Sequence, residues 1–244
     1  MNFIQYGKKK INFEIKRGNR KKTVAIHVNP IATVTVLAPQ YLSEEKIRMM
    51  VQKKARWIIE KQEIIRENKH FNSVKEFVSG EAFPYLGREY RLKVVKSNSE
   101  KEGKCELING RFLVEINKNL ENGRWKEAVK MALMDWYLVH AKKKIQERVD
   151  YYSAQIGEKP AYIDIRKQKK RWGSCSHTGV VRLNWKIIME PISVIDYVIV
   201  HELCHLKYPH HSSQFWQKVQ SIIVDYKKRR ELLKQYSYTM DVLG

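Results

Sequence analysis

Several features that mark secreted or membrane proteins are missing from the sequence. It holds only three cysteines, Cys105, Cys175 and Cys204. Their odd number and wide spacing exclude a disulfide framework and favour a reducing compartment. The most apolar stretch, residues 192–200, is interrupted by two polar residues, so no segment predicts a membrane span. The start of the chain lacks the unbroken apolar core of a signal peptide. We therefore expect a soluble, cytoplasmic protein without a membrane partner.

Acidic residues are also scarce. The 26 Asp and Glu residues stand against 47 Lys and Arg, which gives a formal net charge of +21. Such a charge favours anionic partners, nucleic acid among them, because Lys and Arg side chains that neutralise phosphate groups release the counterions of the nucleic acid. The basic residues are spread along the chain, however, and a lysine-rich solvated surface explains the charge equally well. If nucleic acid binds, we expect the contacts to come from one cluster: Lys167, Lys169, Lys170 and Arg171.

The hydrophobic content of 43% and the length of 244 residues predict one large or two small globular domains. In the first half, short segments that alternate or are β-branched are separated by turn residues, which is typical of strands. We expect strands at residues 11–16, 23–28, 33–38, 83–86, 90–95, 105–108 and 112–116. The first three would form a small meander. One helix is expected over residues 43–68, with Trp57 in the core, and Asn109-Gly110 predicts a hairpin turn.

The hydrophobic period changes in the second half of the chain. From Trp125 to about Tyr151 the apolar residues follow helical spacing, so we expect one long amphipathic helix there. Two strands follow, at residues 161–165 and 180–185. No internal repeat and no low-complexity linker is recognisable in the sequence.

A second apolar pattern of helical spacing predicts a mostly buried helix from Ile192 to about Lys207. Ser193 and Asp196 have the spacing of a capping box at its start, although Asp is a weaker partner there than Glu. Beyond this helix, Ser212 is expected to cap a further helix that carries Phe215 and Trp216, and a basic helix is expected from Lys227 to about Gln235. The helix that begins at Ile192 carries the sequence H-E-L-C-H, which holds the residues of greatest chemical interest.

His201 and His205 are four residues apart, so their imidazoles lie on one face of the helix and can bind the same metal ion. Glu202 is rotated by about 100° from His201, which places its carboxylate beside the metal, where it can take a proton from metal-bound water. This arrangement is typical of zinc hydrolases. Chance polar residues on an amphipathic helix are the alternative, but a buried histidine pair without a partner would be costly.

A catalytic zinc needs three protein ligands and one position open to water. Tyr208 precedes Pro209, a pair that ends the helix, so the chain can fold back and present His210 or His211. The offset of His211 from the first histidine is the one that H-E-x-x-H-x-x-G-x-x-H proteases use, which favours His211, although Tyr208 replaces the glycine of that motif. A downstream carboxylate, Glu231, is the alternative third ligand.

Further motifs lie around this helix and upstream of it: Arg20-Lys21-Lys22, Ala38-Pro39, Trp57-Ile58, Gly80-Glu81, Tyr85-Leu86-Gly87, Arg171-Trp172-Gly173-Ser174-Cys175, Leu183-Asn184-Trp185, Ile195-Asp196-Tyr197-Val198 and His211-Ser212 with Phe215-Trp216. With the H-E-L-C-H helix, they resemble the YgjP-like predicted metal-dependent hydrolases, small zincins related to the SprT and WLM metallopeptidases. The resemblance covers nearly the whole chain. Together with the strand and helix patterns of the two halves, it leads us to expect an α+β fold, in which a β-rich N-terminal part, residues 1–118, precedes a small zincin-like catalytic domain, residues 119–244.

The resemblance also implies roles for single residues. His201, His205 and His211 would be the metal ligands, and Glu202 would be the catalytic base. The Asn that usually precedes the third histidine in this family is His210 here. A substrate is not implied, because the family is named from its motif more than from its chemistry.

The Arg-Trp-Gly-Ser-Cys stretch precedes the metal helix and predicts a strand that presents backbone groups to an extended peptide. Arg171 could bind a carboxylate or phosphate group through two parallel hydrogen bonds. Ser174 and Asn184 are the further candidate substrate contacts. A structural role for Arg171 is an equal alternative. We expect Trp172 in the core and Gly173 at a backbone turn.

We therefore expect a hydrolase with one zinc ion per chain, most simply a metallopeptidase of peptide or protein substrates, in which Glu202 activates a zinc-bound water. One alternative, which the charge favours, is a phosphohydrolase of nucleotides or nucleic acid. Two-metal phosphohydrolases need more carboxylates than this helix offers, however. The other alternative is a nucleic-acid-binding protein with a mainly structural zinc. Glu202 argues against it, because a structural site has no use for a base and closes with a fourth protein ligand.

Overall fold

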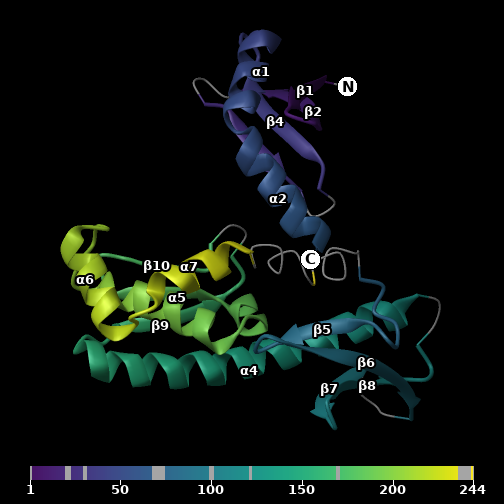
Figure 1. The fold of residues 1–244 in the computed structure, drawn as a ribbon. Coiled ribbons are helices and arrows are strands. Elements are labelled where there is room, and N and C mark those ends of the chain that lie inside the picture. The colour runs from purple at the N-terminus through teal and green to yellow at the C-terminus, as the bar shows by residue number, and fades with distance from the viewer. Residues whose placement is uncertain are drawn as a thin grey trace. The chain divides into compact units, whose positions relative to one another are not determined.

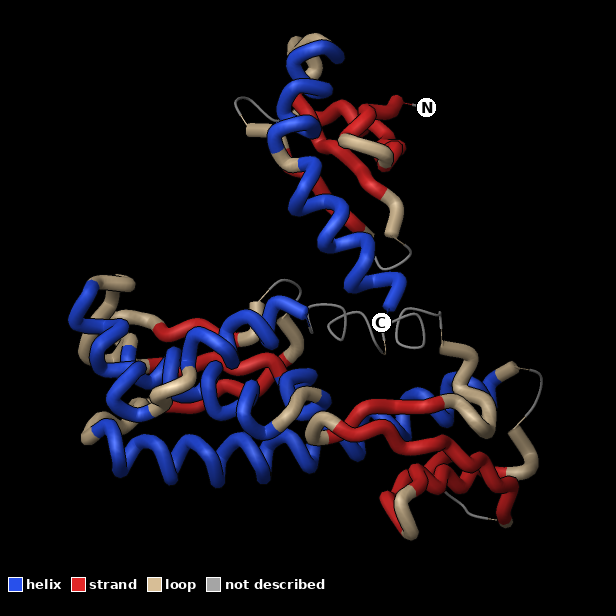
Figure 2. The backbone as a smooth tube through the Cα atoms, in the orientation of Figure 1, coloured by secondary structure: helices blue, strands red, loops and turns tan. Residues whose placement is uncertain are grey.

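The computed structural model describes residues 2–19, 23–29, 32–67, 75–98, 102–120, 123–168, 171–235 and 243. The chain forms two compact units, Met1–Val74 and Lys75–Gly244. Each unit combines helices with sheets (Figures 1 and 2), so the predicted α+β class is confirmed. Among the described residues, no helix has both the length and the apolar character that crossing a membrane requires.

The division between the units lies between residues 74 and 75, whereas the sequence pattern predicts a boundary between residues 118 and 119. The difference arises because the strands of residues 82–117 pack on the long helix that follows them. Phe83, Phe112 and Val114 from these strands share one buried cluster with Leu133 and Tyr137 of that helix. A boundary at residue 118 would cut through this cluster.

The first unit has one four-stranded sheet covered by two helices. Its strands are β1 (Asn2–Tyr6), β2 (Lys9–Gly18), β3 (Ala25–Val28) and β4 (Val34–Pro39). The order is β1-β2-β4-β3, and β2 pairs with β4 in parallel. The predicted meander is therefore wrong, because β3 lies on the outer side of β4 and pairs with it alone.

The helices of the first unit are α1 (Glu44–Lys53) and α2 (Ala55–Glu67). Ser43 caps α1 as predicted, since its side chain accepts a hydrogen bond from the Lys46 N–H. The predicted single helix is interrupted at Lys54, the C-cap of α1, and its expected last residue, 68, lies outside the described residues. Trp57 was expected in the core, but 40% of it is exposed, so this prediction is wrong.

The second unit begins with a sheet of the same topology. Its strands are β5 (Ala82–Tyr85), β6 (Arg88–Ser97), β7 (Gly103–Ile108) and β8 (Arg111–Asn117), in the order β5-β6-β8-β7. The inner pair, β6 and β8, is again parallel, and each outer pair is antiparallel. The chain thus contains a structural repeat that the sequence analysis missed. The predicted Asn109-Gly110 hairpin is confirmed, with φ of 49° and 72° at the two turn residues.

Helix α4 (Arg124–Ile156) is the central element of the second unit. Its 33 residues correspond to about 50 Å of helix, and Figure 1 shows it extending from below the C-terminal helices to the sheet of β5–β8. The side chain of Tyr137 is buried, and its hydroxyl donates a 2.7 Å hydrogen bond to the carbonyl of Pro84. The helix therefore connects the repeated sheet to the rest of the unit through one continuous core.

A small third sheet and three helices complete the second unit. The strands are β9 (Tyr162–Arg166), β10 (Gly173–Cys175) and β11 (Val180–Asn184), in the order β10-β11-β9, and they are followed by the short 3-10 helix η1 (Trp185–Met189). The helices are α5 (Ile192–Cys204), α6 (Ser213–Ile222) and α7 (Tyr226–Gln235). β10 is an edge strand of this sheet.

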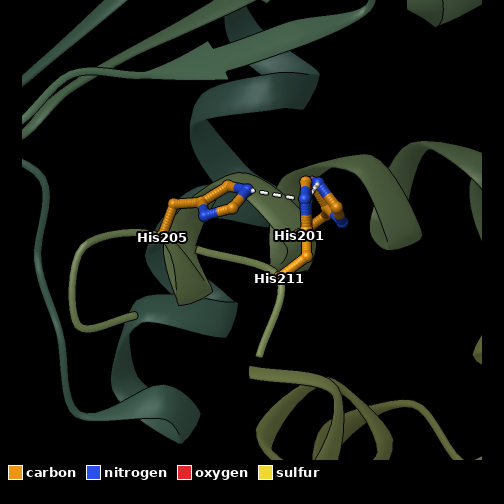
Figure 3. Close-up of side chains that lie close together, drawn as sticks. All are labelled: His201, His205 and His211. Carbon is orange, nitrogen blue, oxygen red and sulfur yellow. Dashed lines mark hydrogen bonds between the residues drawn. The ribbon is translucent and has the colours of Figure 1, made fainter. Parts of the chain in front are cut away.

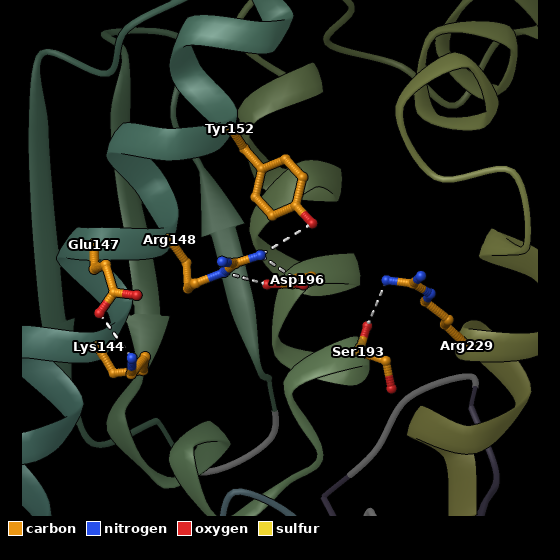
Figure 4. A network of polar contacts seen from close by, with 7 residues as sticks. All are labelled: Lys144, Glu147, Arg148, Tyr152, Ser193, Asp196 and Arg229. Atoms are coloured by element: carbon orange, nitrogen blue, oxygen red, sulfur yellow. Dashed lines mark hydrogen bonds and ion pairs between the residues drawn. The ribbon is translucent and has the colours of Figure 1, made fainter.

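Helix α5 is held in place by polar contacts from two neighbouring helices (Figure 4). Arg148 of α4 binds the Asp196 carboxylate through Nε at 2.7 Å and Nη2 at 2.9 Å, and the Asp196 side chain is only 8% exposed. Arg229 of α7 donates to the carbonyl of Ser193 at 3.3 Å. The predicted capping box is wrong, because Pro191 is the N-cap and Asp196 serves as the partner of Arg148.

Candidate metal centre

The C-terminal end of α5 carries the first two histidines. His201 lies in its last turn and His205 is its C-cap, so the helix ends before the predicted residue, Lys207. The N–H of Tyr208 bonds back to the carbonyl of Cys204 at 2.9 Å. The chain then reverses at Pro209, as the sequence predicts, and brings the following histidines back towards α5.

Three imidazoles converge at this reversal (Figure 3). The Nε2 atom of His211 lies 3.0 Å from Nε2 of His201 and 3.2 Å from Nε2 of His205. Among the described residues, these three histidines form a group whose ligand atoms all lie within 4.8 Å of one another. The Nδ1 of His205 lies 3.0 Å from the carbonyl oxygen of Tyr208. Because a carbonyl only accepts, Nδ1 carries the proton, and the Nε2 lone pair is left for a metal.

His211 lies outside α5, and aromatic residues of α6 position its ring. The Trp216 ring stacks on it with an interplanar angle of 18° at 5.4 Å between centroids. Phe215 contacts the same imidazole edge-on at 4.9 Å. Helix α6 begins at the predicted cap, Ser212, whose hydroxyl accepts from the Phe215 N–H at 3.3 Å. A helix that carries Phe215 and Trp216 was expected from the sequence, but their packing against His211 was not.

The other two candidates for the third ligand do not join the cluster. His210 is exposed, and its side chain is absent from the group of converging donors. Glu231 forms an ion pair with Lys234 at 2.6 Å on the exposed face of α7. Of the alternatives that the sequence left open, His211 is the one whose ring nitrogen lies beside those of His201 and His205.

Burial and nearby positive charge lower the pKa values of His201 and His211. The pKa of His201 is lowered to about 3, first by burial and then by the neighbouring His205 and His211. The pKa of His211 is also lowered, first by burial and then by His205, Arg230 and His210. A neutral imidazole offers a free nitrogen lone pair, so these shifts favour cation binding over protonation.

Glu202 lies on α5 beside the cluster and is nearly buried, with 7% of its surface exposed. Burial raises its pKa to about 8, and Arg171 opposes this shift. A carboxylate in such surroundings is a stronger base than an exposed one. A Cβ atom on Gly173 would lie 2.7 Å from both Cγ and Oε1 of Glu202, so β10 can approach this carboxylate only because it has glycine there.

Gly173 was expected at a backbone turn, but this prediction is wrong, because the residue lies within β10. Its role was missed, although a glycine inside a predicted strand is a known signal of close backbone approach. Trp172, the preceding residue, is buried as predicted.

A cavity of about 400 Å³ opens over the histidines and Glu202. It is lined by Arg171, Gly173, Ser174, Cys175, Ser176, His177, His201, Glu202, His205, Pro209 and His211. Two of the three predicted substrate contacts, Arg171 and Ser174, are among these residues. His177, which the sequence analysis did not consider, is exposed at the same cavity.

Asn184, the third predicted substrate contact, lies elsewhere. Its side chain is fully buried and does not line the cavity. The Nδ2 atom donates to the carbonyls of Gln168 at 2.9 Å and Arg171 at 3.3 Å, and Oδ1 accepts from the Lys186 N–H at 3.3 Å. Asn184 therefore positions the backbone that leads to Arg171 instead of meeting a substrate.

The predicted basic cluster is only partly described. Lys167 is exposed and does not line the cavity, whereas Arg171 does. Lys169 and Lys170 lie outside the described residues. Of the two described bases, only Arg171 lines the cavity above the histidines.

Comparison with known families agrees with this geometry. The model of the YgjP-like metallopeptidase domain matches residues 22–236, which include the whole cluster. The chain belongs to the YgjP-like family. This family is one of metallopeptidases, so its members are hydrolases of peptides or proteins that use a divalent metal ion.

Two solved structures are similar to part of this YgjP-like chain. The metallopeptidase zymogen abylysin of Pyrococcus abyssi is 22% identical, over 36% of this chain and 90% of that chain, with a TM-score of 0.34. The metallopeptidase zymogen jannalysin of Methanocaldococcus jannaschii is 21% identical, over 37% of this chain and 94% of that chain, with a TM-score of 0.35. A comparison with curated proteins gives no match.

Proposed function

We propose that this protein is a zinc peptidase, in which His201, His205 and His211 hold one zinc ion and Glu202 is the general base. The observation that carries the proposal is the convergence of three imidazole Nε2 atoms beside a buried carboxylate in one open cavity. Membership of a metallopeptidase family supports the reaction class.

The donor set fits zinc. Three neutral imidazoles with a fourth position open to water form the usual ligand set of a catalytic zinc site. Nitrogen ligands of a tetrahedral zinc are roughly 3.3 Å apart, given Zn–N distances of about 2.0–2.1 Å. The two Nε2–Nε2 separations that involve His211 are 3.0 and 3.2 Å. When bound, zinc supplies a Lewis acid that makes water acidic near neutral pH and polarises a carbonyl group.

The residues of the chain supply the proton transfer. Glu202 accepts a proton from the attacking water and then donates it to the nitrogen of the leaving amine, so one carboxylate serves both half-reactions. Its burial between α5 and β10 keeps the carboxylate in one place. Gly173 is the residue that leaves room for it.

An extended peptide is expected to bind along β10. This edge strand contributes Gly173, Ser174 and Cys175 to the cavity wall. Gly173 packs directly against Glu202. Edge strands bind extended peptides through main-chain hydrogen bonds. Ser174 takes part in this peptide contact. Asn184, which the sequence suggested as a second substrate contact, instead supports the backbone at Arg171.

The alternatives from the sequence lack support of this kind. Among the described residues, Glu202 is the only acid that lines the cavity, whereas two-metal phosphohydrolases need several carboxylates. Nucleic-acid binding through Lys167, Lys169, Lys170 and Arg171 stays a prediction. Neither the family nor the geometry of the site favours it.

The decisive experiment compares the wild-type protein with Glu202→Gln after zinc reconstitution. We expect the wild type to cleave a denatured protein. The variant should retain zinc but cleave about 10²–10⁴-fold more slowly. Nucleoside triphosphates serve as the second substrate class, and their hydrolysis in place of protein cleavage would reject the peptidase. A variant that also loses zinc would identify Glu202 as a ligand and not a base.

A further inference from the structure

The charges around the cavity are unequal. Its wall holds the guanidinium of Arg171, whereas Glu202 is the only acid among the described residues that line it. Glu202 is nearly buried and, in the proposed mechanism, is occupied by proton transfer. The accessible part of the wall therefore presents positive charge to a bound peptide.

Arg171 has no carboxylate partner among the described residues, in contrast to three other arginines of the same unit. Arg148 binds Asp196, and Arg166 and Arg182 both lie within ion-pair distance of Asp164. No described Asp or Glu lies within 4.0 Å of the Arg171 guanidinium, although the residue is exposed at the cavity. An arginine in this state can bind an incoming carboxylate through two parallel hydrogen bonds.

The backbone at Arg171 is fixed from the inside. The Arg171 carbonyl accepts from Nδ2 of the buried Asn184 at 3.3 Å, and the carbonyl of Trp172 accepts from the Asn184 N–H at 2.8 Å. Trp172 is itself buried. One buried asparagine thus holds two successive peptide groups, so the base of the arginine side chain is positioned before a substrate arrives.

Arg171 is also close to the reacting atoms. It precedes Gly173 by two residues, and Gly173 packs directly against the Glu202 carboxylate. Residues of a strand are spaced by about 3.3 Å, so a peptide laid along β10 would pass the guanidinium within one or two residues of the bond that Glu202 serves.

We propose that Arg171 is a specificity residue that selects peptides with an acidic side chain within two residues of the scissile bond, and that Asn184 positions it. This inference rests on the proposed peptidase function and adds the class of substrate. A glutamate or aspartate carboxylate would pair with the guanidinium, whereas a lysine at the same place would meet an unpaired positive charge.

The test uses the zinc-loaded full-length protein. A denatured protein is digested, the cleavage sites are mapped by mass spectrometry, and quenched fluorescent peptides are made on the preferred site with Glu, Gln or Lys at the selected position. For the wild type we expect kcat/KM to be about 10-fold higher for the Glu peptide than for the Gln peptide, as for a hydrogen-bonded charged pair. The ratio should fall as salt is added.

Four variants locate the effect. Arg171→Gln should remove the preference, Arg171→Lys should keep part of it, and Arg171→Glu should invert it in favour of the Lys peptide. Arg111→Glu is the matched control, since it makes the same change of charge at an exposed arginine outside the cavity, and it should keep the wild-type preference. Zinc content and circular dichroism are measured for every variant.

The outcomes separate the two proposals. Cleavage without an acidic preference, or a preference that survives in Arg171→Gln, overturns the inference and leaves the peptidase intact. The absence of cleavage of any peptide by the zinc-loaded wild type overturns the peptidase and the inference together.

Discussion

Replacing Gly173 by alanine tests whether the position of the Glu202 carboxylate limits the reaction. The added Cβ would lie 2.7 Å from Cγ and Oε1 and 2.9 Å from Cδ of Glu202. Carbon atoms in contact are normally about 3.5–4.0 Å apart, so the carboxylate must move by about 1 Å. The glutamate is nearly buried and cannot simply swing into solvent.

The expected cost falls on catalysis more than on stability. A displacement of about 1 Å at a catalytic group can cost about 10²-fold in rate, which corresponds to roughly 2.7 kcal/mol of activation free energy. A single added methyl group that a side chain can partly accommodate costs about 1 kcal/mol of folding stability, the lower end of the range for overpacking. Zinc content should not change, because the three atoms nearest to the new methyl group all belong to Glu202 and not to a histidine.

The assay measures kcat/KM on a cleaved peptide, zinc content and the midpoint of thermal unfolding. Gly18→Ala is the control, since a Cβ atom there would meet nothing within 4 Å, and it should leave all three values unchanged. If Gly173→Ala acts through Glu202, the double variant with Glu202→Gln should be no slower than Glu202→Gln alone. Wild-type activity in Gly173→Ala, or additive losses in the double variant, would refute this reasoning.

Other consequences of the structure can be measured separately. His211→Ala should weaken zinc binding in a chelator competition far more than His210→Ala, and equal losses would show that the third ligand is misassigned. Trp216→Leu, which removes the ring stacked on that imidazole, should weaken zinc binding about 10–100-fold, as loss of supporting contacts does at other metal sites, without abolishing it. Asp196→Ala should lower the free energy of unfolding by about 3 kcal/mol in urea titrations, because it leaves the Arg148 guanidinium partly buried and unpaired; a change below about 1 kcal/mol would contradict this. Chelation of zinc present at 100 times its dissociation constant should remove about 2.7 kcal/mol of stability, and an unchanged melting temperature would exclude a site formed in the folded state.

The placement of the first three site residues follows from local sequence. A helix fixes the angle between neighbouring side chains, so the spacing of His201, Glu202 and His205 determines that the two imidazoles converge while the carboxylate lies beside them. Turn and cap chemistry is equally local, and both the Asn109-Gly110 hairpin and the Ser212 cap are confirmed. The predicted family is confirmed as well, because its motifs recur along almost the whole chain.

Strand order was not available from local patterns. The alternation of apolar residues marks β2, β3 and β4 as strands but does not say which of them pair. The parallel pairs β2–β4 and β6–β8 depend on contacts between segments far apart in the sequence. For the same reason the structural repeat escaped notice, since its two copies share a topology more clearly than a sequence.

Tertiary structure decided the remaining parts of the site. The sequence left His210, His211 and Glu231 open as third ligands, and the chain reversal after α5 together with packing on Trp216 brings only His211 to the other two histidines. Asn184 was expected at the substrate, but the fold buries it behind Arg171. These outcomes depend on which surfaces of α5, α6 and β10 meet in space, and short-range spacing does not encode such contacts between elements.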